Sequence, residues 1–235
     1  MRCAVFGASG GIGAALVDAL AARADVSEVW AGARQPPAGA AKVRGFAFDL
    51  ADEAGIAAAF VAIGAPLDMV LVATGRLTLA NGAGPEKAMR ALDPGRLAES
   101  FAINAIGPAL IAKHALPLLP RDRRAVFAAL SARVGSIADN RLGGWHAYRA
   151  SKAALNMLVR NMAIELARTH PQALAVTLHP GTVDTALSAP FQRGVPAERL
   201  FTPAWSADRL LTVLDSLSPA QSGRLYAWDG AEIPF

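Results

Sequence analysis

Short apolar runs alternate with longer segments of helical period along the whole chain. Most of the short runs are unbroken stretches of Val, Leu, Phe and Ala, which is typical of strands covered on both faces. Strands separated by helical segments are the pattern of βαβ units that build a parallel sheet. The pattern predicts about seven strands: Arg2–Phe6, Val26–Ala31, Val43–Phe48, Leu67–Ala73, Arg124–Leu130, Ala173–Leu178 and Arg224–Ala227.

Four segments between these strands carry helix signals. Residues 11–23 have apolar side chains at 12, 15, 16, 19 and 20, which is helical spacing. Residues 93–114 and 203–216 each open with an N-cap residue directly before a proline, a favoured helix start. Residues 150–167 carry one apolar face. We therefore expect a doubly wound α/β fold of the Rossmann type, with about seven parallel strands flanked by helices.

Length and composition favour a single domain over residues 1–235. A chain of 235 residues with 53% hydrophobic residues buries the core of one sizeable α/β domain. The longest charge-free stretches resemble 54–67, shorter than the ~18–20 apolar residues that span a bilayer. The first residues lack a signal-peptide pattern, and the lone Cys3 lies in an apolar run. These features predict a cytoplasmic protein without a membrane segment.

The basic character of the chain does not indicate nucleic-acid binding. The net charge is +4, and apart from Arg121–Arg124 the basic residues are scattered singly. Lysine is rare, with only Lys42, Lys87, Lys113 and Lys152. A lysine close to a candidate catalytic residue is therefore itself a candidate for the active site.

A glycine-rich loop lies between the first predicted strand and the first helix. Backbone amides of such a loop approach a pyrophosphate, and glycine is needed because a Cβ would obstruct both the turn and this approach. The position of the loop between a strand and an amphipathic helix predicts a dinucleotide site. Its residues are Gly7, Ser9, Gly10, Gly11, Ile12 and Gly13.

The end of the second predicted strand indicates which dinucleotide is bound. NAD sites usually place an acidic residue there for the ribose hydroxyls, whereas a 2′-phosphate favours arginine. The chain has Arg34 and no acid at this place, so NADP(H) is favoured over NAD(H), although Arg34 as a solvated loop charge is the alternative. Past the third strand, Asp49 and Leu50 are candidates for adenine contacts, and a turn or cap role for Asp49 remains open.

Tyr148 and Lys152 are four residues apart and share one helix face. A free phenol with a pKa of ~10 is a poor acid or base at neutral pH, and a nearby cation lowers that value. Tyr148 would then exchange a proton with a carbonyl or alcohol oxygen while a nicotinamide transfers a hydride. This spacing predicts an acid/base pair. No metal site is expected.

With these motifs the chain resembles the short-chain dehydrogenase/reductase family over essentially its whole length. The shared marks are Gly7, Gly11 and Gly13, Asn104 within 101–107, and the Tyr148–Lys152 pair. The resemblance implies that Asn104 orders a water linked to Lys152, and that the chain self-associates through its helices at 93–115 and 150–167. It also implies a nicotinamide-binding loop after the sixth strand, with contacts from Pro180, Gly181, Val183 and Thr185.

Two positions depart from the family pattern. Ala73-Thr74-Gly75 stands where Asn-Ala-Gly is usual, and Gly75 still permits close approach to the cofactor. The family has a Ser-Ser pair after strand five, and the second serine binds the substrate oxygen, whereas this chain has Ser131-Ala132. Successive strand residues face opposite sides, so Ser131 serves only if the strand end twists or bulges. Ser136 is the other candidate hydroxyl, and we favour Ser131; the loss of both would remove one oxyanion donor.

Several further short sequence motifs resemble those of the C-factor, or cell–cell signalling, branch of the family. This branch implies no particular substrate. The motifs are Gly135–Asn140, Gly143–Trp145, His179–Thr185 and Trp228–Gly230.

On the substrate side, the family places a mobile lid at about 186–201. Phe191, Trp145, His146 and Leu187 are candidates for its apolar wall. The sequence thus predicts an NADP(H)-dependent oxidoreductase acting on a small carbonyl or alcohol. The alternative is a dinucleotide-binding signalling or regulatory protein with vestigial turnover.

Overall fold

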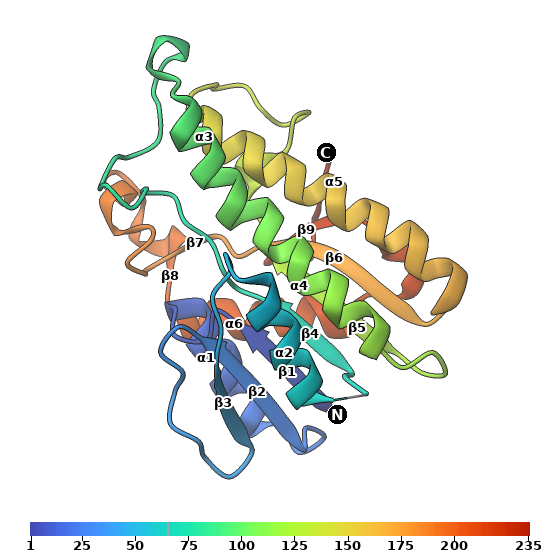
Figure 1. The fold of residues 1–235 in the computed structure, drawn as a ribbon. Helices are drawn as coiled ribbons and strands as arrows, with labels where there is room; N and C mark the ends of the chain where they lie inside the picture. Colours follow the sequence, from blue (N-terminus) through green and yellow to red (C-terminus); the bar gives the residue numbers. More distant parts are fainter. Residues whose placement is uncertain (65) are drawn as a thin grey trace.

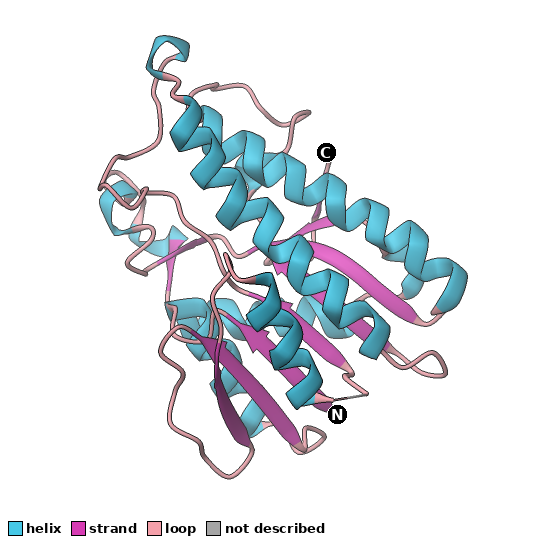
Figure 2. Cartoon of the chain, viewed as in Figure 1, coloured by secondary structure: helices cyan, strands magenta, loops and turns pink. Residues whose placement is uncertain are grey.

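The computed structural model describes residues 1–64 and 66–235, which form an α/β structure around one sheet (Figures 1 and 2). The sheet has eight strands in the order β10-β9-β6-β5-β4-β1-β2-β3, and all neighbours are parallel except β9 and β10. Its strands are β1 (Arg2–Phe6), β2 (Glu28–Ala33), β3 (Val43–Ala47), β4 (Met69–Val72), β5 (Ala125–Leu130), β6 (Ala173–His179), β9 (Leu225–Ala227) and β10 (Glu232–Ile233).

Helices cover both faces of the sheet, as the doubly wound prediction requires. Helices α1 (Gly11–Ala22) and α6 (Pro203–Ser216) pack together against one face. Helices α2 (Glu53–Ile63), α4 (Gly107–Ala115) and α5 (His146–Thr169) cover the other face. The predicted Rossmann-type fold is confirmed.

The side chains of the first strand, β1, pack into the hydrophobic clusters on both faces of the sheet. Ala4 and Phe6 belong to the core cluster under α2, α4 and α5, while Cys3 and Val5 belong to the cluster under α1 and α6. Burial raises the pKa of the Cys3 thiol to about 12, so it stays protonated. Alternate side chains therefore reach opposite hydrophobic layers, which explains why residues 3–6 of this strand are all apolar.

The structure corrects several predicted boundaries. The second strand begins at Glu28 instead of Val26, because the Val26 and Ser27 amides bond to the carbonyls of Arg23 and Met1. The antiparallel strand β10 and the helix α2 were not among the predicted elements. Helix α2 begins at an Asp52 cap, whose carboxylate accepts a hydrogen bond from the Gly55 amide at 3.0 Å.

The helix predicted over 93–114 contains a change of helical type. Helix α3 (Pro94–Phe101) leads into a π-helical turn, Ala102–Ile106, before α4, and the Gly107 amide bonds to the Ala102 carbonyl five residues back. Pro108 has no N–H to offer the Asn104 carbonyl four residues earlier. The π turn therefore sits at the predicted site residue Asn104, and π-bulges are frequent at functional sites.

By length and composition alone, the helical segment Pro94–Leu118 could cross a membrane. No membrane segment was expected from the sequence, because only stretches without charged residues were considered. The charges in Pro94–Leu118 are widely spaced. Ile111, Ala112 and Ala115 are buried in the core beneath this helix layer. Packing within the fold accounts for these apolar side chains.

Candidate active site

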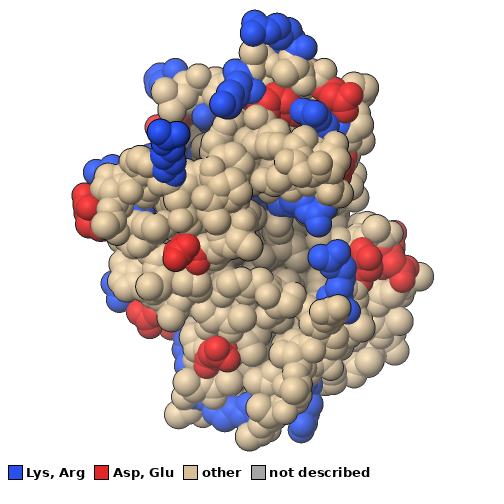
Figure 3. All heavy atoms as spheres, turned by 90° about the vertical axis from the view of Figure 1, so that its left-hand side faces the viewer, with Lys and Arg blue, Asp and Glu red and all other residues tan. Residues whose placement is uncertain are grey.

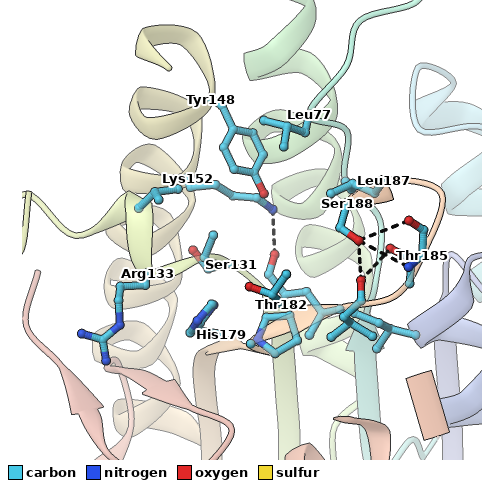
Figure 4. Close-up of a pocket in the computed structure, with 18 of the residues that line it drawn as sticks. Leu77, Ser131, Arg133, Tyr148, Lys152, His179, Thr182, Thr185, Leu187 and Ser188 are labelled. Atoms are coloured by element: carbon cyan, nitrogen blue, oxygen red, sulfur yellow. Dashed lines mark hydrogen bonds between the residues drawn. The ribbon is translucent and has the colours of Figure 1, made fainter. Parts of the chain in front are cut away.

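A cavity of about 260 Å³ opens at the carboxyl edge of the sheet, where the loops after β1, β4, β5 and β6 meet. A hollow is visible on this face in Figure 3, and the Lys and Arg side chains around it are dispersed over the surface. Figure 4 shows the cavity from inside, with residues of α5 on one side and the loop after β6 on the other. Carboxyl ends of parallel strands are where open α/β sheets bind ligands.

The glycine loop is closely packed at three of its positions. Gly7 has φ +92°, and a Cβ there would lie 2.9 Å from the Ala73 carbonyl carbon. A Cβ on Gly13 would lie 2.1 Å from the Gly7 oxygen, and one on Gly11 would lie 2.7 Å from the Thr185 Cγ2. The N-cap residue of α1 is Gly10, which has no side chain to cap the helix. The glycines thus keep open a concave loop, called the glycine cradle below, that larger side chains would fill. The backbone amides at the N-terminus of α1 remain available to bind an anion.

Gly10 and Ser9 differ from these three glycines. A Cβ on Gly10 would lie 3.4 Å from its nearest neighbour, the Gly7 oxygen, which is ordinary contact, and Ser9 already carries a side chain, which is exposed. Ile12 reaches the cavity from the first turn of α1. The loop therefore joins the cavity to the exposed edge of the sheet.

The residues predicted for the adenine end lie outside the cavity. Arg34 directly follows β2, is exposed, and is close to the glycine loop because the Gly7 and Ala8 amides bond to the Gly32 carbonyl. Asp49 has the turn role left open above, since its Oδ1 accepts a hydrogen bond from the Ala51 amide at 2.9 Å. Leu50 packs against Gly107. Adenine contacts from Asp49 and Leu50 stay predictions.

Tyr148 and Lys152 lie one turn apart on α5 and both line the cavity. The ammonium Nζ of Lys152 donates to the Leu130 carbonyl at 2.7 Å and lies 5.9 Å from the centroid of the Tyr148 ring. This pair is the centre of the cavity's chemistry.

The expected lowering of the pKa of Tyr148 by Lys152 is wrong for this structure. Burial raises the pKa of Tyr148 to about 12 and lowers the pKa of Lys152 to about 7. Desolvation disfavours the charged form of each group, and burial is the only cause of either shift. The phenol is therefore protonated at neutral pH, which is the form that can donate a proton.

The start of α5 is held by a buried carboxylate that the sequence did not reveal. Gly143, Gly144 and Trp145 all have positive φ, between 50° and 65°. The Ala147 amide donates to the Glu86 Oε2 at 3.2 Å, and the Trp145 amide donates to the Glu86 carbonyl. Glu86 thus links the loop after β4 to the helix that carries Tyr148.

Asn104 is fully buried behind Tyr148 and Lys152. Its side-chain Oδ1 accepts a hydrogen bond from the Arg76 amide, and its Nδ2 donates to the Arg76 carbonyl, each at 2.9 Å. The Nδ2 also donates to the hydroxyl oxygens of Ser100 and Ser151, each at 3.2 Å. A Cβ on Gly75 would lie 3.5 Å from the Asn104 Oδ1 and 3.6 Å from the Lys152 Nζ. Gly75 therefore leaves the space in which these two groups approach each other.

The structure separates the two candidate serines. Ser131 lines the cavity, but its hydroxyl donates to the Asn156 Oδ1 at 2.8 Å. Ser136 is not among the cavity residues; its hydroxyl donates to the Pro234 carbonyl and accepts from the Asp139 amide. Ala132 lines the cavity without a polar group. Ser131 remains the better candidate, although its hydroxyl is occupied.

The loop after β6 brings Pro180, Gly181, Val183 and Thr185 to the cavity, and their contacts with the nicotinamide stay predictions. Gly181 has φ +80°, and a Cβ there would lie 2.7 Å from the Phe201 ring. The Val183 carbonyl accepts hydrogen bonds from the Thr185 and Ser188 hydroxyls. The loop is therefore a shaped wall of the cavity.

The predicted lid region, 186–201, covers one side of the cavity. Short strands β7 (Thr182–Val183) and β8 (Leu200–Phe201) pair at its two ends. Of the predicted wall residues, Trp145, Leu187 and Phe191 line the cavity, whereas His146 does not. The Trp145 and Phe191 rings are 5.3 Å apart. Mobility of this region stays a prediction.

Sequence reasoning missed several further cavity residues. Thr74 has a buried hydroxyl without a hydrogen-bond partner among the described residues, and His179 has a buried Nδ1 in the same state. Leu77 and Val195 add apolar surface. His179 precedes the Pro-Gly phrase in the chain, which was the available signal, but only the fold places its ring in the cavity.

Comparison with known proteins identifies the family. A family model described as short chain dehydrogenase matches residues 2–195. C-signal of Myxococcus xanthus is 39% identical over 145 residues, which cover 61% of this chain and 81% of C-signal. Two other relatives, 32% and 36% identical, are matched over 56% and 58% of their own lengths.

Solved structures agree over the whole chain. The carbonyl reductase Sniffer of D. melanogaster has a TM-score of 0.86 at 21% identity, covering 100% of this chain and 99% of that protein. An NADPH-bound carbonyl reductase from chicken fatty liver has a TM-score of 0.83 at 26% identity, covering 100% and 98%. The predicted resemblance is confirmed, and the chain belongs to the short-chain dehydrogenase family of oxidoreductases.

Proposed function

We propose that this protein is an NADP(H)-dependent oxidoreductase that interconverts a small carbonyl compound and an alcohol, with Tyr148 as general acid/base. The observation that carries the proposal is the Tyr148–Lys152 pair, buried in a cavity that the glycine loop and the loop after β6 also reach. NADPH oxidation measured against a panel of aldehydes and ketones tests it. No oxidation of NADPH with any carbonyl, despite measurable NADPH binding, would contradict the proposal.

The chain's own groups support proton delivery to a carbonyl oxygen. When bound, NADPH supplies the hydride. The protonated Tyr148 donates its proton to the substrate oxygen, and the Lys152 ammonium stabilises the phenolate that is left. Pro108 has no N–H, so the backbone carbonyl of Asn104 lacks its α-helical hydrogen bond. This free carbonyl supports the expectation from the family that Asn104 binds a water linked to Lys152. Trp145, Leu187 and Phe191 add apolar side chains to the cavity wall, which limits the water around the reacting atoms.

Cofactor preference is inferred from Arg34 at the end of β2. The glycine cradle fits a dinucleotide, and the exposed guanidinium fits a 2′-phosphate. The chicken carbonyl reductase was solved with NADPH bound. Arg34→Ala is expected to weaken NADPH binding about tenfold or more, because a charge-assisted contact contributes ~1.5–3 kcal/mol. Fluorescence titration measures the affinities for NADPH and NADH, and the NADH affinity should stay unchanged. An equal loss of affinity for the two dinucleotides would contradict the role of Arg34 in binding the 2′-phosphate.

The cradle predicts a contrast between two glycines. Gly13→Ala is expected to lower the free energy of unfolding by ~1–3 kcal/mol through overpacking, and to weaken NADPH binding as the loop shifts. Gly10→Ala is the matched control, because its Cβ meets only ordinary contact, and it should change neither quantity appreciably. Chemical denaturation and NADPH titration check both variants. Equal behaviour of the two would refute the packing argument.

The second candidate is a dinucleotide-binding signalling or regulatory protein with vestigial turnover. Ala132 and the engaged Ser131 hydroxyl favour it, as does the likeness to C-signal. The intact Tyr148–Lys152 pair favours an enzyme. Activity that appears only after Ala132→Ser would support the second candidate.

Self-association through the long helices stays part of the proposal. Ile106 on the π turn and Met157 and Ile164 on α5 are between 45% and 61% exposed. These apolar side chains offer surface for a second copy of the chain.

A further inference from the structure

His179 lies beside Ser131, one residue before the position where the family serine is missing. It ends β6, and Leu130 and Leu178 are register partners, so the next residues, Ser131 and His179, leave neighbouring strands side by side. Both line the cavity, as does Ala132. In Figure 4 the His179 ring lies on the wall next to Ser131, below the Tyr148–Lys152 pair.

On this wall the imidazole has unused hydrogen-bonding capacity. The Ser131 hydroxyl is engaged by Asn156, and the Arg133 guanidinium pairs with Asp139 at 2.8 Å and points away from Tyr148. The Nδ1 of His179 is buried without a hydrogen-bond partner among residues 1–64 and 66–235. The Nε2 forms no hydrogen bond among these residues either, and because His179 lines the cavity this nitrogen can take a partner from a bound ligand.

The imidazole is neutral at physiological pH. Burial, assisted by the charge of Arg133 and opposed by Asp229, lowers the pKa of His179 to about 4. A neutral imidazole has one N–H donor and one acceptor nitrogen. We assign the proton to Nε2, because an N–H at the enclosed Nδ1 would have no acceptor among the described residues; Nδ1 is then the acceptor nitrogen. The Nε2–H is then free to donate.

We propose that His179 is a substrate-binding residue that donates a hydrogen bond from Nε2 to the carbonyl oxygen of the substrate, and so supplies the contact that Ala132 lacks. This inference rests on the proposed carbonyl reduction. The substrate oxygen then receives one hydrogen bond from Tyr148 and a second from His179, and stabilisation of the developing oxyanion does not depend on Ser131.

Steady-state kinetics of three variants test the assignment. His179→Leu is expected to lower kcat/KM for the best carbonyl of the panel by about 10²-fold, the effect of losing one oxyanion donor, with NADPH affinity unchanged. Adding Ala132→Ser to this variant should restore most of the loss. His170→Leu is the matched control, since His170 is also buried with an unpartnered ring nitrogen but lies at the far end of α5, outside the cavity.

Two kinetic outcomes for the His179 variants would overturn the inference. One is a His179→Leu variant whose kcat/KM stays within twofold of the natural protein. The other is a loss that Ala132→Ser fails to restore, because the imidazole would then not occupy the place of the serine hydroxyl. A comparable loss in His170→Leu would show a general effect of burying leucine and would equally count against the assignment.

A binding experiment separates this inference from the proposed function. Acetophenone is added to the protein saturated with NADP⁺, where no reduction occurs, and the ¹⁵N imidazole signals are followed by NMR. We expect the His179 Nε2 signal to shift while that of His170 stays. A shift without turnover in the carbonyl assays would keep the inference and refute the enzyme. A bound ketone with no shift would refute the inference, and absence of ketone binding would refute both.

Discussion

Tyr148→Phe is expected to lower kcat for carbonyl reduction by about 10²- to 10⁴-fold, the usual contribution of a positioned general acid. NADPH binding should be unchanged, because the phenol lies at the reacting end of the cavity and the glycine loop is untouched. The fold should also tolerate the change, since phenylalanine fills the same buried space without the hydroxyl. Single-turnover kinetics at saturating NADPH measure the loss directly.

The second tyrosine provides a matched control for this experiment. The chain has two tyrosines, and the hydroxyl of Tyr226 on β9 donates to the Gln221 carbonyl at 3.2 Å, away from the cavity. Tyr226→Phe should cost ~0.5–1.5 kcal/mol of stability through that hydrogen bond and leave kcat intact. If Tyr148→Phe retained full turnover, the acid would have to be another group.

Lys152→Met is expected to lower kcat/KM by a similar factor, about 10²-fold or more, because the phenolate formed on proton transfer loses its neighbouring cation. The matched control is Lys113→Met. Lys113 is 62% exposed and pairs with Glu53 at 2.6 Å, far from the cavity, so its loss should leave kcat/KM unchanged. Both are measured with NADPH and the best carbonyl of the panel.

The burial of Lys152 also predicts a pH dependence. Its pKa is lowered to about 7, so the ammonium is present below about pH 7 and is lost as the pH rises through that value. Tyr148, with a pKa raised to about 12, stays protonated over this range. Reduction should therefore decline as the pH rises through about 7. Lys152→Arg, whose guanidinium stays charged, should lack this decline in the activity that it retains; a flat profile for the natural protein would contradict the account.

The strands and the first, fifth and sixth helices were predictable because their signals are local. Apolar runs identified the seven parallel strands within one or two residues at most ends, and Pro203 after Thr202 marked the start of α6. Helix α2 is rich in alanine, which blurs the contrast between its faces, and β10 has only two residues. The π turn at Asn104 was hidden because helical propensity does not register a change in hydrogen-bond spacing.

Within the site, the sequence by itself determined the glycine loop, the position of Arg34 after a strand, and the placement of Tyr148 and Lys152 on one helix face. Each follows from spacing along the chain and from the stereochemistry of a helix or a tight turn. The absence of a hydroxyl at position 132 was equally visible.

Only the tertiary structure decided the charge states and the partners. The burial that raises the pKa of Tyr148 comes from segments distant in the chain, and it reverses the direction that the spacing with Lys152 had suggested. Asn156 engages Ser131, and the sheet register places His179 beside Ser131, one residue before the missing serine. Desolvation and strand register depend on which segments pack together, and local sequence does not contain that information.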